Sequence, residues 1–111
     1  MVSNTDFSKL ALSFQEVTEE PHFEKASYRI RKKIFATMQK DNSIGCLKLT
    51  EVDQSVYCEI DKSIIYPVPN KWGKQGWTYV DLGQINKKLL KEMMTKAYCS
   101  VAPEALSRKY Q

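Results

Sequence analysis

Few features of this 111-residue sequence point to a class of protein, and what is missing already excludes several classes. No uncharged apolar run approaches the roughly 20 residues needed to cross a bilayer. The N-terminal segment has no basic stretch followed by an apolar one, so we expect no secretory signal. The three cysteines are widely spaced and odd in number, which indicates reduced thiols rather than a disulfide framework. We therefore expect a cytoplasmic protein that does not associate with membranes.

Residues that carry chemistry are scarce as well. The one histidine, His22, could act as a general base beside Glu20 or Glu24, but a histidine at a strand entry more often just bonds to the backbone. Gly73 and Gly76 belong to neither a Walker loop nor a dinucleotide fingerprint. The sequence thus predicts no catalytic centre and no cofactor, and we interpret the chain as a binding module rather than an enzyme.

The sequence gives metal binding little support. The cysteines fit no zinc spacing rule, and Cys58 and Cys99 are expected to be buried thiols on helices. Glu16, Glu19 and Glu20 could bind a divalent cation at a helix edge, although a solvated acidic edge is the more common arrangement. No metal site is therefore predicted.

What is present suits an ordinary globular domain. The hydrophobic fraction is 42%, and the chain contains four Phe, six Tyr and two Trp, which is enough for a conventional core. No repeat or low-complexity tract divides the sequence. We expect a single domain over residues 1–111, and a monomer.

The spacing of apolar residues predicts an α+β fold. Helical periodicity predicts a first helix capped by Asp6, a second over about 50–61, and a third that begins at Gln84 or Asn86. Alternation predicts strands over 28–31, 34–38, 47–49, 64–66 and 77–82. The order α-β-β-β-α-β-β-α favours a two-layer sandwich with an antiparallel sheet.

Several local expectations follow from the same patterns. Residues 19–21 are predicted to break the first helix, and Lys32 with Lys33 to reverse the chain. On the second strand, Ile34 is expected to share a face with Ala36 and Met38, with Phe35 on the opposite face. Residues 70–76 are predicted to be a loop.

Charge is distributed unevenly along the chain. Residues 21–40 hold six basic residues against one acidic residue, and residues 71–111 hold eight against three. Lysine and arginine at such positions can contact phosphates and release counterions. In the segment 70–77 (NKWGKQGW), indoles alternate with lysines, a combination that can stack on bases while the cations hold the backbone. Trp77 alone is more typical of a core residue. The expected nucleic-acid contacts are Arg29, Arg31, Lys32, Lys33, Lys48, Lys71, Trp72 and Lys74.

Five blocks of sequence, spread over most of the chain in a fixed order, resemble the MmcQ/YjbR family. They are residues 21–30 (PHFEKASYRI), 33–37 (KIFAT), 66–69 (YPVP), 72–77 (WGKQGW) and 97–103 (AYCSVAP). Cys99 stands in the last block where a larger or polar residue is usual. The resemblance implies an α+β fold similar to secretion chaperones and frataxin-like domains, and a DNA-binding protein with a double-wing motif.

Three functions stay open at this stage. The first is double-stranded DNA binding with weak or no sequence specificity. In this function the basic hairpin around Arg29 to Lys33 and the Trp/Lys loop, residues 71–77, act as wings. The second is a non-enzymatic protein-interaction adaptor that uses the exposed sheet face, which requires an apolar patch around Phe35, Trp72 and Tyr79. The third is a small-ligand or metal-handling domain that uses the acidic end of the first helix.

Overall fold

The computed structural model describes residues 2–111 and confirms the α+β fold. Six antiparallel strands form one sheet in the order β1-β2-β3-β4-β6-β5. The strands are β1 (Val17–His22), β2 (Lys25–Ile30), β3 (Lys33–Gln39), β4 (Ile44–Lys48), β5 (Ile65–Pro67) and β6 (Trp77–Asp81). The helices are α1 (Asn4–Leu12), α2 (Glu51–Cys58), α3 (Lys71–Lys74), α4 (Lys87–Val101) and α5 (Glu104–Ser107), followed by a 3₁₀ turn at Arg108–Tyr110.

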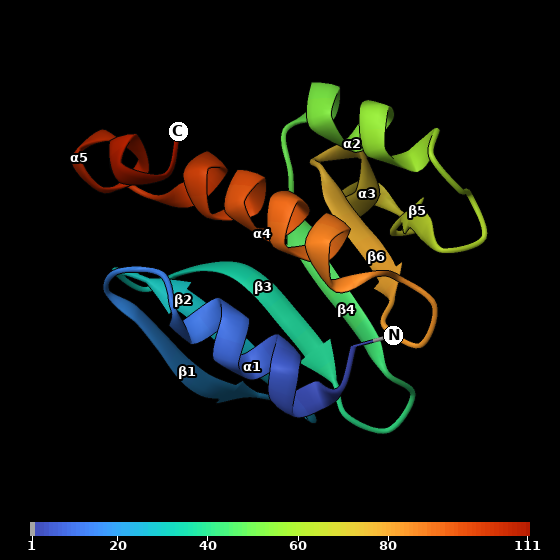
Figure 1. Ribbon diagram of the computed structural model, residues 1–111, viewed down its shortest axis with the longest axis horizontal. Coiled ribbons are helices and arrows are strands. Elements are labelled where there is room, and N and C mark those ends of the chain that lie inside the picture. The colour runs from blue at the N-terminus through green and yellow to red at the C-terminus, as the bar shows by residue number, and fades with distance from the viewer. Residues whose placement is uncertain (1) are drawn as a thin grey trace.

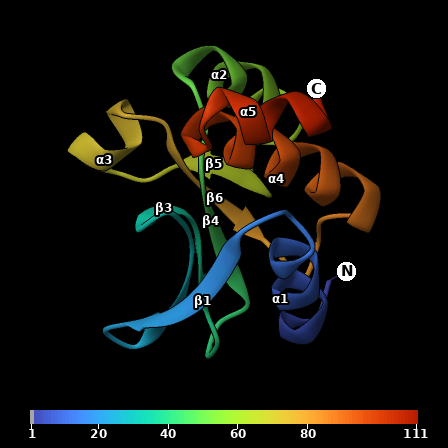
Figure 2. The same cartoon turned by 90° about the vertical axis from the view of Figure 1, so that its left-hand side faces the viewer.

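The helices and the sheet form two layers. The long helix α4 and the N-terminal helix α1 cover one face of the sheet (Figure 1). Viewed from the side, the sheet is strongly curved, and the β1–β2 hairpin and α3 both project away from the helix layer (Figure 2). The opposite face of the sheet is therefore concave. No helix among residues 2–111 is long and apolar enough to cross a membrane.

Side-chain caps set the starts of the main helices. Ser3 caps α1 by accepting a hydrogen bond from the backbone N–H of Asp6, so the helix begins before the predicted cap at Asp6. Thr50 caps α2 in the same way, with the N–H of Asp53 as donor. Asn86, one of the two predicted openings, caps α4. Each such cap supplies an acceptor to an N–H group that has no partner within the helix.

The strand β1 replaces the predicted break at residues 19–21. It lies at the edge of the sheet and pairs with β2 from Val17 against Ile30 to His22 against Lys25. Proline lacks an N–H donor and is tolerated at an edge, because the free side of an edge strand needs no ladder bond. Because this segment is charged and contains proline, its sequence did not indicate a strand.

The β2–β3 turn lies one residue earlier than predicted. Its two central residues are Arg31 and Lys32, both with positive φ (49° and 73°), and Lys33 already belongs to β3. Two positive φ values are typical of a type I′ turn, whose twist matches that of the flanking strands. The tip of this hairpin is thus basic.

A β-bulge reverses the predicted faces of β3. Tyr28 pairs with Ala36, but the next residue, Arg29, pairs with Ile34, so Phe35 is an extra residue. Phe35 then points into the core with no exposed surface, and Ile34 is only half-buried on the concave face. The prediction that Ile34 shares a face with Ala36 and Met38, opposite Phe35, is therefore wrong, because a single inserted residue shifts the alternation.

The core between the sheet and the helices is rich in aromatic rings. The rings of Phe14 and Tyr98 stack with centroids 4.8 Å apart, and Phe35 meets both of them edge-on. Tyr110, from the C-terminal turn, packs on the same pair at 5.0 Å. The last turn of the chain therefore contributes to the core.

The buried phenol of Tyr28 makes the stability of the folded protein depend on pH in the alkaline range. Its side chain is fully buried, and its hydroxyl forms no hydrogen bond of ordinary geometry among residues 2–111, although Ser8 and Glu19 lie near it. Burial raises the pKa of Tyr28 to about 12. In the unfolded chain the phenol ionises near pH 10. The contribution of the neutral Tyr28 side chain to the free energy of folding is therefore complete below pH 10 and is lost as the pH rises toward 12. A shift of two pKa units between the unfolded and folded states corresponds to about 2.7 kcal/mol of folding free energy.

We therefore expect the variant Tyr28→Phe to resist alkaline unfolding. Urea unfolding at pH 8 should show a variant as stable as the parent or about 1 kcal/mol more stable, since an unpaired buried hydroxyl is removed. At pH 11.5 the free-energy difference in favour of the variant should grow by about 1 to 2 kcal/mol. Loss of stability at pH 8 would contradict the prediction, since it would mean that the hydroxyl makes a favourable bond.

Candidate functional site

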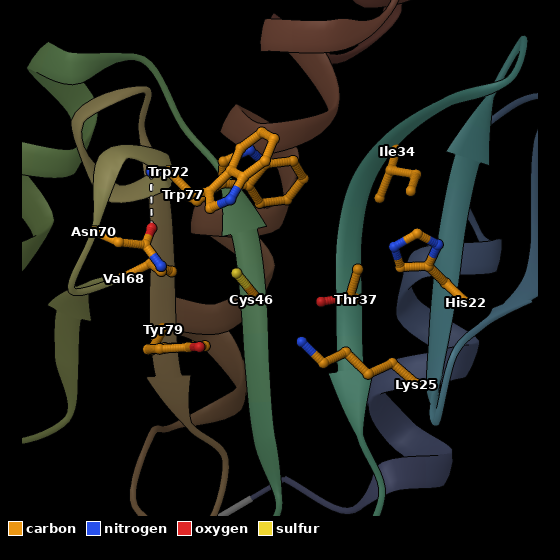
Figure 3. A pocket seen from close by; sticks show the side chains of 10 residues that line it. All are labelled: His22, Lys25, Ile34, Thr37, Cys46, Val68, Asn70, Trp72, Trp77 and Tyr79. Carbon is orange, nitrogen blue, oxygen red and sulfur yellow. Dashed lines mark hydrogen bonds between the residues drawn. The ribbon is translucent and has the colours of Figure 1, made fainter.

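The concave face of the sheet holds a groove of about 450 Å³ (Figure 3). Its walls come from β1 and β2 on one side, from β3, β4 and β6 along the floor, and from the segment around α3 on the other side. The lining residues are His22, Lys25, Ile34, Thr37, Cys46, Val68, Asn70, Trp72, Trp77 and Tyr79.

Strand register explains why these side chains meet. Thr37 on β3 lies opposite Cys46 on β4, which lies opposite Tyr79 on β6, so one row crosses the floor. Trp77 precedes Tyr79 by two residues and therefore points to the same face. Trp77 is half-buried, lines the groove and lies outside the core cluster, so the interpretation of this residue as core is wrong. Its side chain faces the groove rather than the helix layer.

Residues 70–76, predicted to be a loop, contain the short helix α3. Asn70 caps it by accepting a hydrogen bond from the N–H of Trp72 at 2.9 Å. Trp72 is 49% exposed at the groove, and the Lys71 ammonium lies 5.6 Å from its ring centroid. A short helix therefore holds an indole and two lysines at the rim.

The two glycines of this segment are required by close backbone contacts. A Cβ at Gly73 would overlap the carbonyl of Val68, and a Cβ at Gly76 would overlap the carbonyl of Leu49. Gly76 also has φ +105°, a conformation that L side chains rarely adopt. The Gly73–Gly76 spacing thus serves the fold of the Trp/Lys segment rather than phosphate binding.

Gln54 on α2 holds α3 in place through hydrogen bonds. This role was not predicted from the sequence. The Gln54 amide nitrogen donates to the carbonyls of Gly73 (2.9 Å) and Trp77 (3.1 Å) and to the hydroxyl of Thr78 (3.1 Å). These bonds join α3 and the start of β6 to α2. No local sequence pattern marks Gln54, because its partners are 19 to 24 residues away.

The groove is apolar with a positive side. Burial raises the pKa of the Cys46 thiol to about 11 and raises the pKa of Tyr79, so both groups are neutral at pH 7. The Lys25 ammonium reaches into the groove (Figure 3), and its charge opposes the rise of the Cys46 pKa. None of the lining residues carries a carboxylate. The groove therefore suits a neutral or anionic ligand with an aromatic or apolar part.

Three of the predicted nucleic-acid contacts are engaged within the protein. The Arg31 guanidinium forms an ion pair with Glu16 at 3.2 Å. Arg29 is largely buried, where it bonds to Ser27 and lies 3.9 Å from Glu20. The Lys48 ammonium donates to the carbonyl of Gln75. These cations stabilise the site's walls, and their ability to bind phosphate is reduced.

The remaining predicted cations are exposed, but they do not all lie at the groove. Lys33, the first residue of β3, pairs with the core residue Ile30 and alternates with the lining residue Ile34, so its side chain points to the helix face of the sheet. Lys71 and Lys74 lie on α3, on either side of Trp72. Lys25 of the first basic segment lines the groove, and Lys71 and Lys74 of the second lie beside it.

The other residues considered as sites are dispersed. His22 ends β1 at the groove, where its ring meets the ring of Phe23 edge-on. Glu16 pairs with Arg31, Glu20 with Arg29, and Glu19 accepts the Ser8 hydroxyl, so these carboxylates point to separate partners. Within residues 2–111, no group of three or more His, Cys, Asp or Glu could hold a metal ion.

A second exposed apolar surface lies on α2. The helix buries Tyr57, but Val52, Val56 and Ile60 are 73%, 58% and 56% exposed. The helical spacing of Val52, Val56, Tyr57 and Ile60 therefore does not mark one buried face. Val52 and Val56, four residues apart, lie on one solvent-facing side of the helix, and Ile60 is exposed just beyond its end.

The fold and the sequence can be compared with known proteins. A solved structure of a Deinococcus radiodurans protein with the domain DUF419 matches with a TM-score of 0.81 at 17% identity, over 99% of this chain and 88% of that chain. At that identity the likeness is one of fold. No curated protein matches the chain. The family model YjbR matches residues 12–100, a range that includes every residue of the groove. The chain belongs to the YjbR family.

Proposed function

We propose that the protein is a non-enzymatic DNA-binding module with weak or no sequence specificity, and that the groove and its basic rim are the binding surface. The observation that supports this most strongly is the combination of two indoles and a phenol in a groove without carboxylates, which Lys25 lines and beside which Lys71 and Lys74 are exposed on α3. Aromatic rings bind bases by stacking, and lysines neutralise phosphates. Sequence discrimination needs a matched set of fixed donors and acceptors, whereas the surface of this groove is mainly apolar with few polar groups.

The test is a titration of labelled DNA, duplex and single-stranded, at several salt concentrations. Binding should be micromolar at low salt, and the logarithm of the affinity should fall linearly with the logarithm of the salt concentration. The double variant Lys25→Ala/Lys74→Ala should bind about tenfold more weakly, with a salt slope smaller by about 1 to 2.

A matched control removes the same charge from the opposite layer. Lys88 and Lys91 are exposed on α4, and no ion pair involves either of them within residues 2–111. The variant Lys88→Ala/Lys91→Ala should retain the parent's affinity and slope to within a factor of about 2. Equal losses in both double variants would mean that only net charge matters, and the groove assignment would be abandoned.

The second candidate function is a protein-interaction adaptor, and the exposed aliphatic side of α2 favours it. Phe35 is buried, so the expected patch around Phe35, Trp72 and Tyr79 reduces to the groove aromatics. Apolar contacts respond weakly to salt, whereas phosphate contacts respond steeply. Binding of a partner that persists at high salt and is lost in Val56→Lys would favour the adaptor.

A further inference from the structure

We infer that the groove takes the faces of unpaired bases, so that the ligand is single-stranded rather than duplex nucleic acid. This inference rests on the proposed function and narrows its ligand class. It comes from the shape of the surface, from the chemistry of its floor and from the two hairpin tips.

The shape of the surface does not suit a duplex. Side chains read duplex DNA from elements that protrude into its grooves, because only base edges are accessible there. The cations of this protein instead surround a concavity whose volume, about 450 Å³, lies in the range of small-molecule sites. A hollow of that size accepts a base or two, and it excludes a rod-like double helix from its floor.

The chemistry of the floor matches base faces. Trp72 is half-exposed at the rim, and Trp77 and Tyr79 continue the aromatic surface along β6. Base faces are hidden by stacking in a duplex and become available in single strands, where aromatic side chains stack on them. Lys25 and Asn70 add polar groups at opposite walls of the groove, positioned to meet base edges (Figure 3).

The hairpin tips argue against action as wings on a duplex. The β1–β2 tip carries Phe23, 92% exposed, and Glu24, a pair that is unsuited to a phosphate backbone. At the β2–β3 tip, Glu16 already neutralises Arg31. The cations nearest the groove are Lys25, which lines it, and Lys71 and Lys74 on α3, so they can contact a single flexible backbone that crosses the groove.

Intrinsic fluorescence gives a direct test, because the protein has only two tryptophans and both line the groove. Three unlabelled probes of equal length are titrated: oligothymidylate, the same backbone without bases, and a duplex. Oligothymidylate should quench the emission and bind at least tenfold more tightly than the other two. The abasic strand has the same phosphates, so the difference isolates the bases.

Two substitutions locate the contact. Trp72→Ala should weaken binding of oligothymidylate roughly tenfold to a hundredfold, the range that stacking on one ring supports. Trp72→Phe keeps a ring and leaves Trp77 as the only indole, so binding should change less than fivefold and Trp77 should still be quenched. Thermal melts of both variants check that the fold is intact.

The outcomes separate the inference from the proposed function. If the duplex or the abasic strand binds as tightly as oligothymidylate, the base-face inference is overturned and salt-dependent DNA binding stands. If none of the three probes binds at low salt, the proposed function fails along with it. If Trp72→Ala and Trp72→Phe weaken binding equally, the indole acts only through the fold of α3, and stacking on Trp72 is wrong.

Discussion

Replacement of Phe35 by alanine is expected to destabilise the protein by about 3 to 5 kcal/mol, the cost of a cavity at a fully buried aromatic position. Phe35 meets Phe14 and Tyr98 edge-on, so its loss opens the centre of the aromatic cluster. The measurement is the free energy of unfolding in urea. A value near 1 kcal/mol would mean that the bulge does not turn Phe35 into the core.

The neighbouring residue is the control. Ile34 is half-buried at the groove, so Ile34→Ala should cost only about 1 kcal/mol, in line with the smaller apolar area that it buries. Simple alternation along β3 predicts the opposite order, with Ile34 inside and Phe35 outside. The ratio of the two effects therefore tests the bulge itself, independently of any ligand.

The second large effect is expected at Gly76. The variant Gly76→Ala should lose at least about 2 kcal/mol, because a Cβ meets the Leu49 carbonyl and the residue has φ +105°. The carbonyl of Gly76 also accepts bonds from the N–H of Leu49 and the hydroxyl of Thr78. A shift there would move Trp77, so the tryptophan emission should change together with the stability.

Gly83 provides the matched control for Gly76. A Cβ at Gly83 meets only a side-chain oxygen of Asp81, at 3.3 Å, so Gly83→Ala should change the unfolding free energy by less than about 1 kcal/mol. If both alanine variants are equally stable, the contact with Leu49 does not constrain the Trp/Lys segment.

Much of the fold could be predicted from the sequence because its signals are local. The apolar face of α4 and the alternation in β2 and β4 each require only a few neighbouring residues to be recognised. The edge strand β1 could not be predicted, since its glutamates and Pro21 resemble a loop. The bulge at Phe35 could not be predicted either. It is a shift in the pairing of β3 with β2, and no pattern within β3 alone indicates it.

The site was predictable in its chemistry and not in its geometry. The alternation of Trp and Lys at residues 71–77 marks one wall of the groove. Which cations stay free depends on partners distant in sequence, as Glu16 is for Arg31 and the Gln75 carbonyl is for Lys48. Gln54 likewise acts across 19 to 24 residues of sequence, so its role emerges only in three dimensions.

The strand order has a consequence for how the protein meets other chains. The two outermost strands are β1, which carries Glu19, Glu20 and Pro21 exposed, and β5, which has three residues and ends at Pro67. Charge, proline and short length are the devices by which natural sheets prevent edge-to-edge aggregation. Both borders therefore disfavour a seventh strand and β-augmentation by a peptide, which leaves the open face of the sheet as the favoured surface for contact.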